Sequence, residues 1–311
     1  MRYLVAGSSG LVGSALVESL EKAEKQVVGI SSKDVDLSDN VATLNWFKEQ
    51  GKFDVVIDAA AKVGGIVANN SNPVEFLSKN LQIQQNLMYA CHLFSVNQFI
   101  FLGSSCIYPR NAMQPIREDY LMTGELEETN SAYAIAKIAG IELVKSYRKE
   151  FGKKWISLMP TNIYGPKDNF SLNSSHVLPA FIRKFSDAKF EGAKTITLWG
   201  TGKPKREFLH SEDLASAVIF ALENYDGEQH LNIGTGQEIS IKDLAEMVAS
   251  IIGFNGEIIW DDSKPDGTPR KLLDSSKINA LGWSHKISLI DGVSKTIDWY
   301  NKALSKGEIR L

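Results

Sequence analysis

The sequence predicts an α/β fold, in which a doubly wound parallel sheet is followed by a smaller α/β C-terminal part. In the first half of the chain, short β-branched runs alternate with segments of helical periodicity. This is the pattern of right-handed βαβ units with helices on both faces of a parallel sheet. In the second half the alternation becomes irregular. The chain has 311 residues, enough for about two domains and for a core that buries roughly three quarters of the unfolded surface.

The elements of the first half follow from apolar periodicity and from the turn residues between the runs. Strands are expected at Tyr3–Ala6, Gln26–Ile30, Phe53–Ala59, Phe99–Ser104 and Trp155–Met159. Helices are expected between them at Leu11–Glu24, Val41–Gln50, Pro73–Phe94 and Ser131–Phe151. Sequential strands joined by helices of this kind are expected to pair in parallel.

The second half is expected to cap the first and to supply substrate contacts, because it is too short and irregular for a separately built enzyme. We place a boundary near Gly165, with some segments crossing between the two parts. Helices are expected at Val177–Ala188, Asp213–Glu223 and Ser240–Ile252, a short strand at Thr195–Leu198, and a long loop at Asp261–Arg270.

Composition excludes several classes of protein. A hydrophobic content of 43% and a charged content of 23% exclude wholesale disorder and a membrane-spanning chain. A net charge of −3 offers no field for nucleic acid or an anionic membrane. The cysteines, Cys91 and Cys106, are too few for a disulfide scaffold, and no histidine has a ligand-like spacing, so we expect no metal site. The chain enters a strand at Tyr3, which leaves no room for a signal peptide and favours a cytoplasmic location.

A glycine-rich turn follows the first predicted strand and opens the first predicted helix. It has the pattern G-x-x-G-x-x-G and consists of Gly7, Ser8, Ser9, Gly10, Leu11, Val12 and Gly13. Glycines can serve only a tight turn, but in the first turn of a doubly wound sheet they favour a pyrophosphate at the positive helix end. We therefore expect residues 1–165 to form a dinucleotide-binding Rossmann-type domain and residues 166–311 a substrate-binding domain.

The residues after the second predicted strand favour NADP(H) over NAD(H). An NAD site usually has an acid about 20 residues after the glycines, whereas here the strand is followed by Ser31 and Lys33, which suit a 2′-phosphate. Asp34 would reverse this preference if it pointed inward, and Lys33 would be an ordinary surface lysine if it pointed outward. Asp36 and Leu37 come next and are expected to contact the adenine amine and the adenine face.

A tyrosine, a lysine and a serine predict a carbonyl-reducing site. Tyr133 and Lys137 are four residues apart near the start of a predicted helix, which puts them on one face. A nearby ammonium is expected to lower the pKa of a phenol from ~10 toward neutrality. Ser104 is expected at the carboxyl edge of the sheet, where its hydroxyl can bond the carbonyl oxygen that Tyr133 protonates. A lone tyrosine on a helix is more often a core residue, so the prediction depends on the combination.

These motifs resemble those of the extended short-chain dehydrogenase/reductases, and longer blocks resemble the family of GDP-L-fucose synthases. The blocks are Ala59–Asn70, Leu102–Pro109, Tyr133–Gly140, Pro160–Pro166, Arg206–His210 and Lys264–Lys271. The resemblance covers nearly the whole chain. One position departs from it, because this family usually has an arginine where the chain has Ser9, and Lys33 is then the remaining candidate for the 2′-phosphate.

The resemblance implies a two-stage enzyme. It implies that GDP-4-keto-6-deoxy-D-mannose is epimerised at C3 and C5, with Cys106 as base and His176 as acid, and is then reduced at C4 with NADPH. A thiol (~8.5) and an imidazole (~6.5) have the pKa values closest to neutrality for such proton transfers. If strand geometry persists past Ser104, Cys106 points to the same face. Without the resemblance, Cys106 would be a core thiol and His176 an ordinary loop-edge histidine.

The resemblance also implies the remaining contacts. For the cofactor they are Leu102, Gly103, Ser104, Ser105, Lys137, Pro160, Thr161, Asn162, Ile163 and His176. For the substrate, the candidates for the phosphates are Lys184, Arg206 and Arg270, Trp199 is expected to pack on the sugar or base, and Asp266 to bond hydroxyls. Asn162 and the segment Asn173–Ser175 are further candidates for a phosphate or sugar. Alternatively, Trp199 fills a gap and the cations are solvated.

Assembly and substrate leave alternatives. In this superfamily the two long helices, Pro73–Phe94 and Ser131–Phe151, commonly pair across a two-fold axis, which implies a homodimer. One alternative for the same scaffold is a related GDP-4-keto-6-deoxy sugar such as a heptose, and another is reduction at C4 without epimerisation. The other hypotheses are a UDP- or dTDP-sugar epimerase or dehydratase, and a sensor without enzyme activity.

Overall fold

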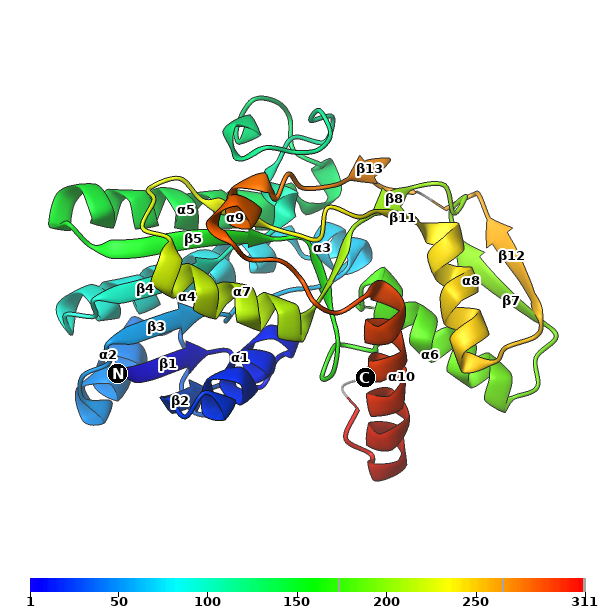
Figure 1. The fold of residues 1–311 in the computed structure, drawn as a ribbon, viewed down its shortest axis with the longest axis horizontal. Coiled ribbons are helices and arrows are strands. Elements are labelled where there is room, and N and C mark those ends of the chain that lie inside the picture. The colour runs from blue at the N-terminus through cyan, green and yellow to red at the C-terminus, as the bar shows by residue number, and fades with distance from the viewer. Residues whose placement is uncertain (173, 265, 310–311) are drawn as a thin grey trace.

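The computed structural model describes residues 1–172, 174–264 and 266–309. Its centre is a six-stranded sheet with the strand order β10-β5-β4-β3-β1-β2, and every adjacent pair is parallel. The strands are β1 (Arg2–Ala6), β2 (Gln26–Ile30), β3 (Val55–Asp58), β4 (Gln98–Leu102), β5 (Lys154–Pro160) and β10 (Leu231–Ile233). The predicted Rossmann-type doubly wound sheet is confirmed (Figure 1).

Helices cover both faces of this sheet because successive strand residues point to opposite sides. Leu4 packs in the core on the side of α2 (Asn40–Gln50), α4 (Pro73–Leu93) and α5 (Ser131–Phe151). Val5 packs on the other side, against α1 (Leu11–Lys22) and α7 (Ser211–Asn224). In the ranges that the structure describes, no helix is both long and apolar enough to cross a membrane.

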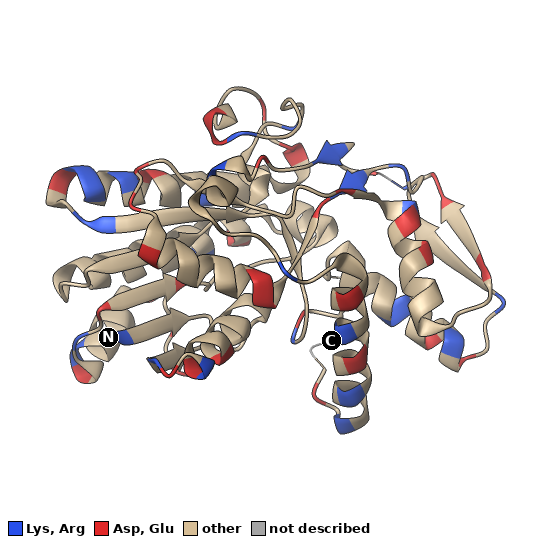
Figure 2. Ribbon diagram, in the orientation of Figure 1, with Lys and Arg blue, Asp and Glu red and all other residues tan. Residues whose placement is uncertain are grey.

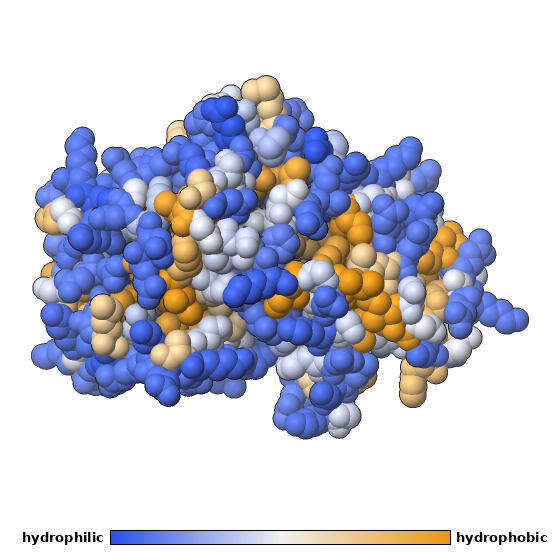
Figure 3. All heavy atoms as spheres, viewed as in Figure 1, coloured by the Kyte–Doolittle hydropathy of each residue, from blue (hydrophilic) through white to orange (hydrophobic). Residues whose placement is uncertain are grey.

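A smaller α/β part lies beside the sheet and has its own core (Figure 1). Its main elements are α6 (Val177–Phe190), β7 (Thr195–Trp199), α8 (Ile241–Ile252), β12 (Glu257–Asp261) and α10 (Leu289–Lys306). Three short strands form a further sheet next to it, namely β8 (Lys205–Arg206), β11 (Ile239–Ser240) and β13 (Arg270–Lys271). The face shown in Figure 3 is mostly hydrophilic, with hydrophobic atoms visible near α6 and α10.

Segments from the second half of the chain return to the large sheet. The strand β10 pairs with β5, α7 packs on α1, and α9 (Ser276–Leu281) contacts β10. The strands β6 (Asn162–Tyr164) and β9 (Phe208–His210) pair at the junction of the two parts. The boundary near Gly165 stays a prediction, and the chain crosses between the two parts several times after it.

The strand that carries Ser104 is shorter than predicted. β4 ends at Leu102, and Ser104 precedes the single turn η1 (Ser105–Ile107). The Cys106 amide donates a hydrogen bond to the Ser104 hydroxyl oxygen, 3.4 Å away, so the chain turns where strand geometry was expected to persist. Three of the described helices were not expected from the sequence, namely α3 (Ile66–Ser71), α9 and α10. The short turns η2 (Glu118–Tyr120) and η3 (Glu128–Asn130) complete the described elements.

Candidate active site

The glycine turn between β1 and α1 is packed too closely for side chains. The Gly7 and Ser8 amides donate to the Ile30 carbonyl oxygen at 2.8 and 2.9 Å. A Cβ atom on Gly7, whose φ is +81°, would lie 2.6 Å from the Ala59 carbonyl oxygen, and one on Gly13 would lie 2.1 Å from the Gly7 carbonyl oxygen. No side chain caps the first turn of α1. The turn therefore fits a pyrophosphate, which accepts hydrogen bonds from free amides at a helix N-terminus.

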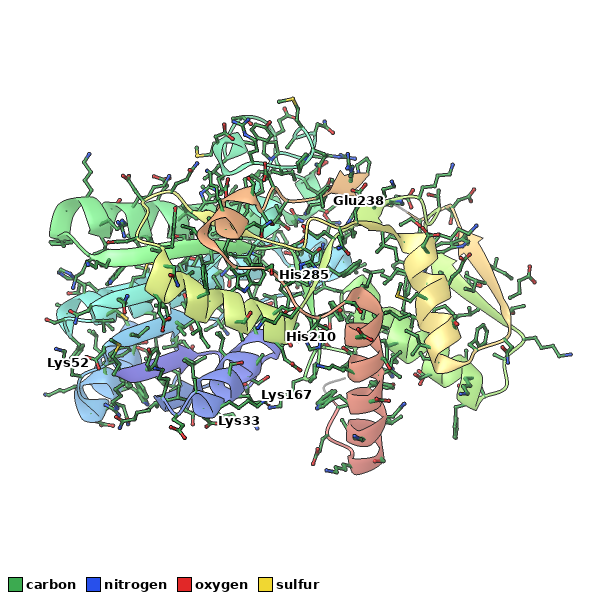
Figure 4. All side chains as sticks on the ribbon, in the orientation of Figure 1. Lys33, Lys52, Lys167, His210, Glu238 and His285 are labelled. Carbon is green, nitrogen blue, oxygen red and sulfur yellow. The ribbon has the colours of Figure 1, made fainter. Side chains whose placement is uncertain are left out.

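The turn after β2 presents one cation and one carboxylate to solvent. Lys33 is exposed (Figure 4). The Asp34 carboxylate is held by its own turn, because the Ser31 amide and hydroxyl both donate to its Oδ2 at 2.8 Å. Asp36 is exposed, whereas Leu37 is only 7% exposed and packs in the core under α2. Lys33 is therefore free to meet a phosphate, and the Leu37 side chain faces away from solvent.

Tyr133 and Lys137 lie on one face of α5, as the spacing predicts. The Lys137 ammonium donates to the Leu102 carbonyl oxygen at 2.8 Å and lies 5.9 Å from the centre of the Tyr133 ring. Burial raises the pKa of Tyr133, and the nearby Cys106 and Asp58 raise it further. The expected lowering of this pKa is therefore wrong, since the loss of water outweighs a lysine that is itself buried and tied to β4. At neutral pH the phenol keeps its proton, which suits a proton donor.

Asp58 is a site residue that the sequence reasoning missed. It ends β3, is 1% exposed, and accepts a hydrogen bond from the Ala60 amide at 3.1 Å. Burial raises its pKa to about 6, while the positive charge of Lys137 acts in the opposite direction. Its negative charge in turn favours the charged form of Lys137, whose pKa burial lowers. An acid directly after three apolar residues, near the carboxyl end of the predicted strand, was the available signal.

Cys106 belongs to the single turn η1, which follows Ser104, and 7% of its surface is exposed. Burial raises the pKa of its thiol, whereas Lys271, the hydrogen bond with Ser104 and Lys137 all act to lower it. The strand-face argument that paired Ser104 with Cys106 is wrong, but η1 brings the two side chains together by a tighter turn. Leu102 and Ser105, on either side, are also buried.

His176 lies just before α6 and is exposed. Partial loss of solvent around the ring lowers its pKa, and the positive charge of Lys271 lowers it further. The neighbouring Ser174 carbonyl oxygen accepts a hydrogen bond from the Gly65 amide at 3.0 Å, which ties this segment to the start of α3. Asn173, part of the predicted sugar-contacting segment, lies outside the described residues.

Lys271 is a second site residue to which the sequence analysis gave no role. Its charge acts on both Cys106 and His176. It also lines a cavity of about 10 Å³ together with Cys106, Glu127 and Thr268. Arg270 lines the same cavity and pairs with Glu238. Lys271 differs from it in that its charge acts on the thiol. Because this segment was expected to begin in a loop, the sequence carried no signal that separates the two residues.

Two of the predicted substrate contacts are engaged within the protein. The Arg270 guanidinium lies 2.6 Å from a Glu238 carboxylate oxygen. Both oxygens of Asp266 accept hydrogen bonds from Thr201, from its amide and its hydroxyl, at 2.7 Å each. Arg206 is partly buried, which lowers its pKa. Basic residues mark the paired strands β8 and β13 (Figure 2).

Trp199 forms an exposed aromatic surface at the end of β7. Its side chain is 58% exposed, so it does not fill an internal gap. The Lys184 and Lys264 ammonium groups each lie 5.8 Å from its ring centre. Burial lowers the pKa of Lys184. An indole bearing cations offers stacking and charge together, which is what a nucleotide requires.

Residues Pro160 to Ile163 connect β5 to β6 and link the two parts of the fold. The Thr161 amide donates to the Ile233 carbonyl oxygen at 2.9 Å. The Thr161 hydroxyl and the Asn162 side-chain amide donate to the Glu207 carbonyl oxygen at 3.2 and 2.8 Å. This connection therefore depends on Glu207, which lies between β8 and β9.

The fold and this site define a dinucleotide-binding α/β protein with the acid–base groups of a carbonyl reductase. The chain belongs to the NAD dependent epimerase/dehydratase family, whose family model matches residues 3–234, and within it to the GDP-L-fucose synthases. GDP-L-fucose synthase 1 of Arabidopsis thaliana is 51% identical over 97% of this chain and 93% of that protein.

Two solved structures show the same fold over nearly their full lengths. The GDP-6-OMe-4-keto-L-xylo-heptose reductase from C. jejuni has a TM-score of 0.91 at 38% identity, covering 97% of each chain. The GDP-L-fucose synthetase from Naegleria fowleri bound to NADP has a TM-score of 0.91 at 29% identity, covering 100% of this chain and 96% of that chain.

Proposed function

We propose that this protein converts GDP-4-keto-6-deoxy-D-mannose to GDP-L-fucose by epimerisation at C3 and C5 followed by NADPH-dependent reduction at C4. The observation that carries the proposal is that η1, which bears Cys106, packs against the helix α5, which bears Tyr133. The two groups are near enough for Cys106 to contribute to the raised pKa of the phenol. A simple ketone reductase needs Tyr133 and Lys137. A thiol in the same site adds the means to exchange protons at carbons next to the ketone.

The glycine turn and Lys33 are proposed to hold the cofactor. The free amides of the turn would bind the pyrophosphate, Lys33 the 2′-phosphate, and Lys137 the nicotinamide ribose. A relative that is solved with NADP bound supports NADP(H) as the cofactor. When bound, the reduced nicotinamide supplies the hydride that C4 receives.

The protein's own groups then divide the proton transfers between them. The C4 ketone acidifies the hydrogens at C3 and C5, and Cys106 removes each of them while His176 returns a proton on the other face. The buried thiol must first lose its own proton, and Lys271 and Lys137 are the cations that favour the thiolate. Tyr133 then donates its proton to the C4 oxygen, which Ser104 holds by a hydrogen bond.

The test is incubation with GDP-4-keto-6-deoxy-D-mannose and NADPH or NADH in deuterated water, followed by NMR of the product. We expect GDP-L-fucose with deuterium at C3 and C5, and one NADPH oxidised per product formed. A product that is reduced at C4 but retains the manno configuration and carries no deuterium would contradict the epimerase half. Turnover without NADPH consumption would indicate an epimerase or dehydratase that retains its cofactor.

A related GDP-4-keto-6-deoxy sugar, such as a heptose, is the second candidate substrate. It is supported by the heptose reductase, which is 38% identical to this chain, whereas GDP-L-fucose synthase 1 of Arabidopsis thaliana is 51% identical and favours the fucose precursor. The ratio of kcat/KM for the two sugars decides between them. A kcat/KM that is higher for the heptose than for the fucose precursor would identify the heptose as the substrate.

The active form is proposed to be a cytoplasmic homodimer joined through α4 and α5. These helices expose large apolar side chains, namely Tyr89 (42%), Leu93 (49%), Ile135 (49%) and Phe151 (47%). Exposed apolar residues gathered on paired helices favour a protein interface. The mass measured by light scattering tests this, and Leu93→Lys and Ile135→Lys together are expected to give a monomer.

A further inference from the structure

Glu207 is a buried carboxylate with four hydrogen-bond donors. It lies between β8 and β9 and has no exposed surface (0%). Its Oε1 accepts from the Thr235 and Gly236 amides at 2.6 and 2.7 Å and from the Thr235 hydroxyl at 3.4 Å. Its Oε2 accepts from the Leu273 amide at 3.1 Å. The carboxylate thus joins two segments that are distant in sequence.

The surrounding backbone is shaped to admit this carboxylate. A Cβ atom on Gly234 would lie 2.4 Å from Oε1 of Glu207, so glycine leaves the room that the acid occupies. Gly236 has a φ of +72°, a conformation that turns successive amides toward one acceptor. In the part of the chain that the structure describes, no salt bridge reaches Glu207, and main-chain amides make most of its bonds.

A buried carboxylate is costly unless its oxygens are well bonded. Burial raises the pKa of Glu207, while the bonds from Leu273, Gly236 and Thr235 act to lower it. The site therefore retains a group that an apolar side chain could replace at lower desolvation cost. The carboxylate of Glu207 is therefore explained by the segments that it holds in place rather than by its packing.

The segments that Glu207 joins carry the cations of the substrate side. Arg206 is its neighbour on β8, and Leu273 follows two residues after Lys271 on the paired strand β13. Arg206 and Lys271 are close enough that the charge of Arg206 lowers the pKa of Lys271. Two like charges held this near need a rigid support to keep one arrangement.

We propose that Glu207 is a positioning residue that fixes Arg206 and Lys271 together for the phosphates of the nucleotide sugar. The proposal rests on the proposed function, because it assumes a nucleoside diphosphate as the ligand of these cations. The carboxylate touches neither substrate nor cofactor, and acts by tethering β13 to β8 through Leu273. The Glu207 carbonyl, which holds Thr161 and Asn162, is independent of its side chain.

The test compares binding of GDP and of NADPH to Glu207→Gln by calorimetry, together with the steady-state KM and kcat. The amide NH₂ faces amide donors and breaks at least one bond, so we expect the Kd for GDP and the KM for the nucleotide sugar to rise at least ~10-fold. The Kd for NADPH should change by less than about 2-fold, because the cofactor side depends on the main chain.

Asp213→Asn is the matched control. Asp213 is also a buried carboxylate, 3% exposed, and accepts from the Lys286 and Ile287 amides at 3.0 and 2.9 Å. It lies on α7, on the face of the sheet that α1 also covers. We expect it to lower Tm as Glu207→Gln does and to leave both KM and the Kd for GDP unchanged.

Gly234→Ala is a second variant, to be used if Glu207→Gln does not fold. It keeps the negative charge of Glu207 but displaces the carboxylate, so it should also weaken GDP binding. Equal affinities for GDP in wild type and in whichever of these variants folds would overturn the proposal, as would a parallel loss of NADPH binding. If the wild-type protein itself fails to bind GDP, the proposed function is wrong.

Discussion

The Lys137 ammonium lies 5.9 Å from the centre of the Tyr133 ring while it donates to the Leu102 carbonyl oxygen at 2.8 Å. Lys137 is thus held by a hydrogen bond to β4, and only its charge reaches the phenol. Burial keeps the proton on Tyr133 and lowers the pKa of Lys137. The Tyr133 hydroxyl therefore keeps the proton that we expect it to donate to the C4 oxygen during reduction.

Tyr133→Phe should abolish reduction but leave epimerisation in place. Removing the hydroxyl removes the proton donor, so the rate of NADPH oxidation should fall by roughly 10²- to 10⁴-fold. Deuterium should still enter C3 and C5, as NMR of the unreduced sugar would show. Near-normal NADPH oxidation in this variant would remove Tyr133 from the mechanism.

Cys106→Ala should block the entry of solvent deuterium at C3 and C5. The base is lost, whereas Tyr133 and Lys137 are untouched. Cys91→Ala is the control, because Cys91 is a fully buried thiol on α4 and should affect stability alone. Normal deuterium incorporation in Cys106→Ala would sink the assignment of the base, and His176 would then be the next residue to test.

Lys271→Met should make the Cys106 thiol harder to ionise. Lys271 is the largest charge that lowers the pKa of this thiol, so its loss should move that pKa upward. The measurement is the alkylation rate against pH in a Cys91→Ala background, where a single thiol reacts. An unchanged midpoint would mean that the ammonium does not act on Cys106.

The sequence predicts the sheet and the placement of Tyr133 and Lys137 on one helix face more readily than the precise geometry of the site. β-branched periodicity locates five of the central strands, because a buried parallel strand requires a continuous apolar run. It misses β10, a three-residue strand whose place depends on tertiary pairing with β5. The turn after Leu102 was missed because its cause is contact across strands: a Cβ on Gly103 would lie 2.3 Å from the Met159 sulfur.

Charges were the least predictable part of the site. Spacing put Lys137 beside Tyr133 correctly but gave the wrong direction for the phenol pKa, since burial is a property of the whole fold. The roles of Asp58 and Lys271 depend on the same three-dimensional context. Arg270 and Asp266 looked free in sequence, and each has an internal partner that lies far along the chain.

Lys33→Ala should weaken the preference for NADPH over NADH. Lys33 is exposed at the end of β2, and a lost charged contact to a phosphate costs about 10-fold in kcat/KM for NADPH. The value for NADH should stay within about 2-fold, because NADH has no 2′-phosphate. Ser9→Arg, on the exposed side of the glycine turn, is the reverse variant and should strengthen the preference. Equal losses with both cofactors in Lys33→Ala would assign the lysine a structural role.

His230 should make the protein sensitive to acid. It is 2% exposed, and burial lowers its pKa to about 4. The Tyr108 hydroxyl donates to Asn232 at 2.5 Å, so His230 donates its Nε2 proton to Tyr108 at 2.8 Å. The imidazole is therefore held in its neutral form in the folded state.

The sign of the effect follows from proton binding. Between its ordinary value of about 6.5 and about 4, the unfolded chain binds a proton at His230 that the folded protein does not. Its contribution is present above pH 6.5 and is lost as pH falls, up to about 3 kcal/mol by pH 4. In urea titrations, His230→Gln should lose less stability than wild type between pH 7 and pH 4.5, whereas His285→Gln should follow wild type. If the free energy of unfolding falls equally with pH in His230→Gln and in wild type, protonation of His230 does not destabilise the folded protein.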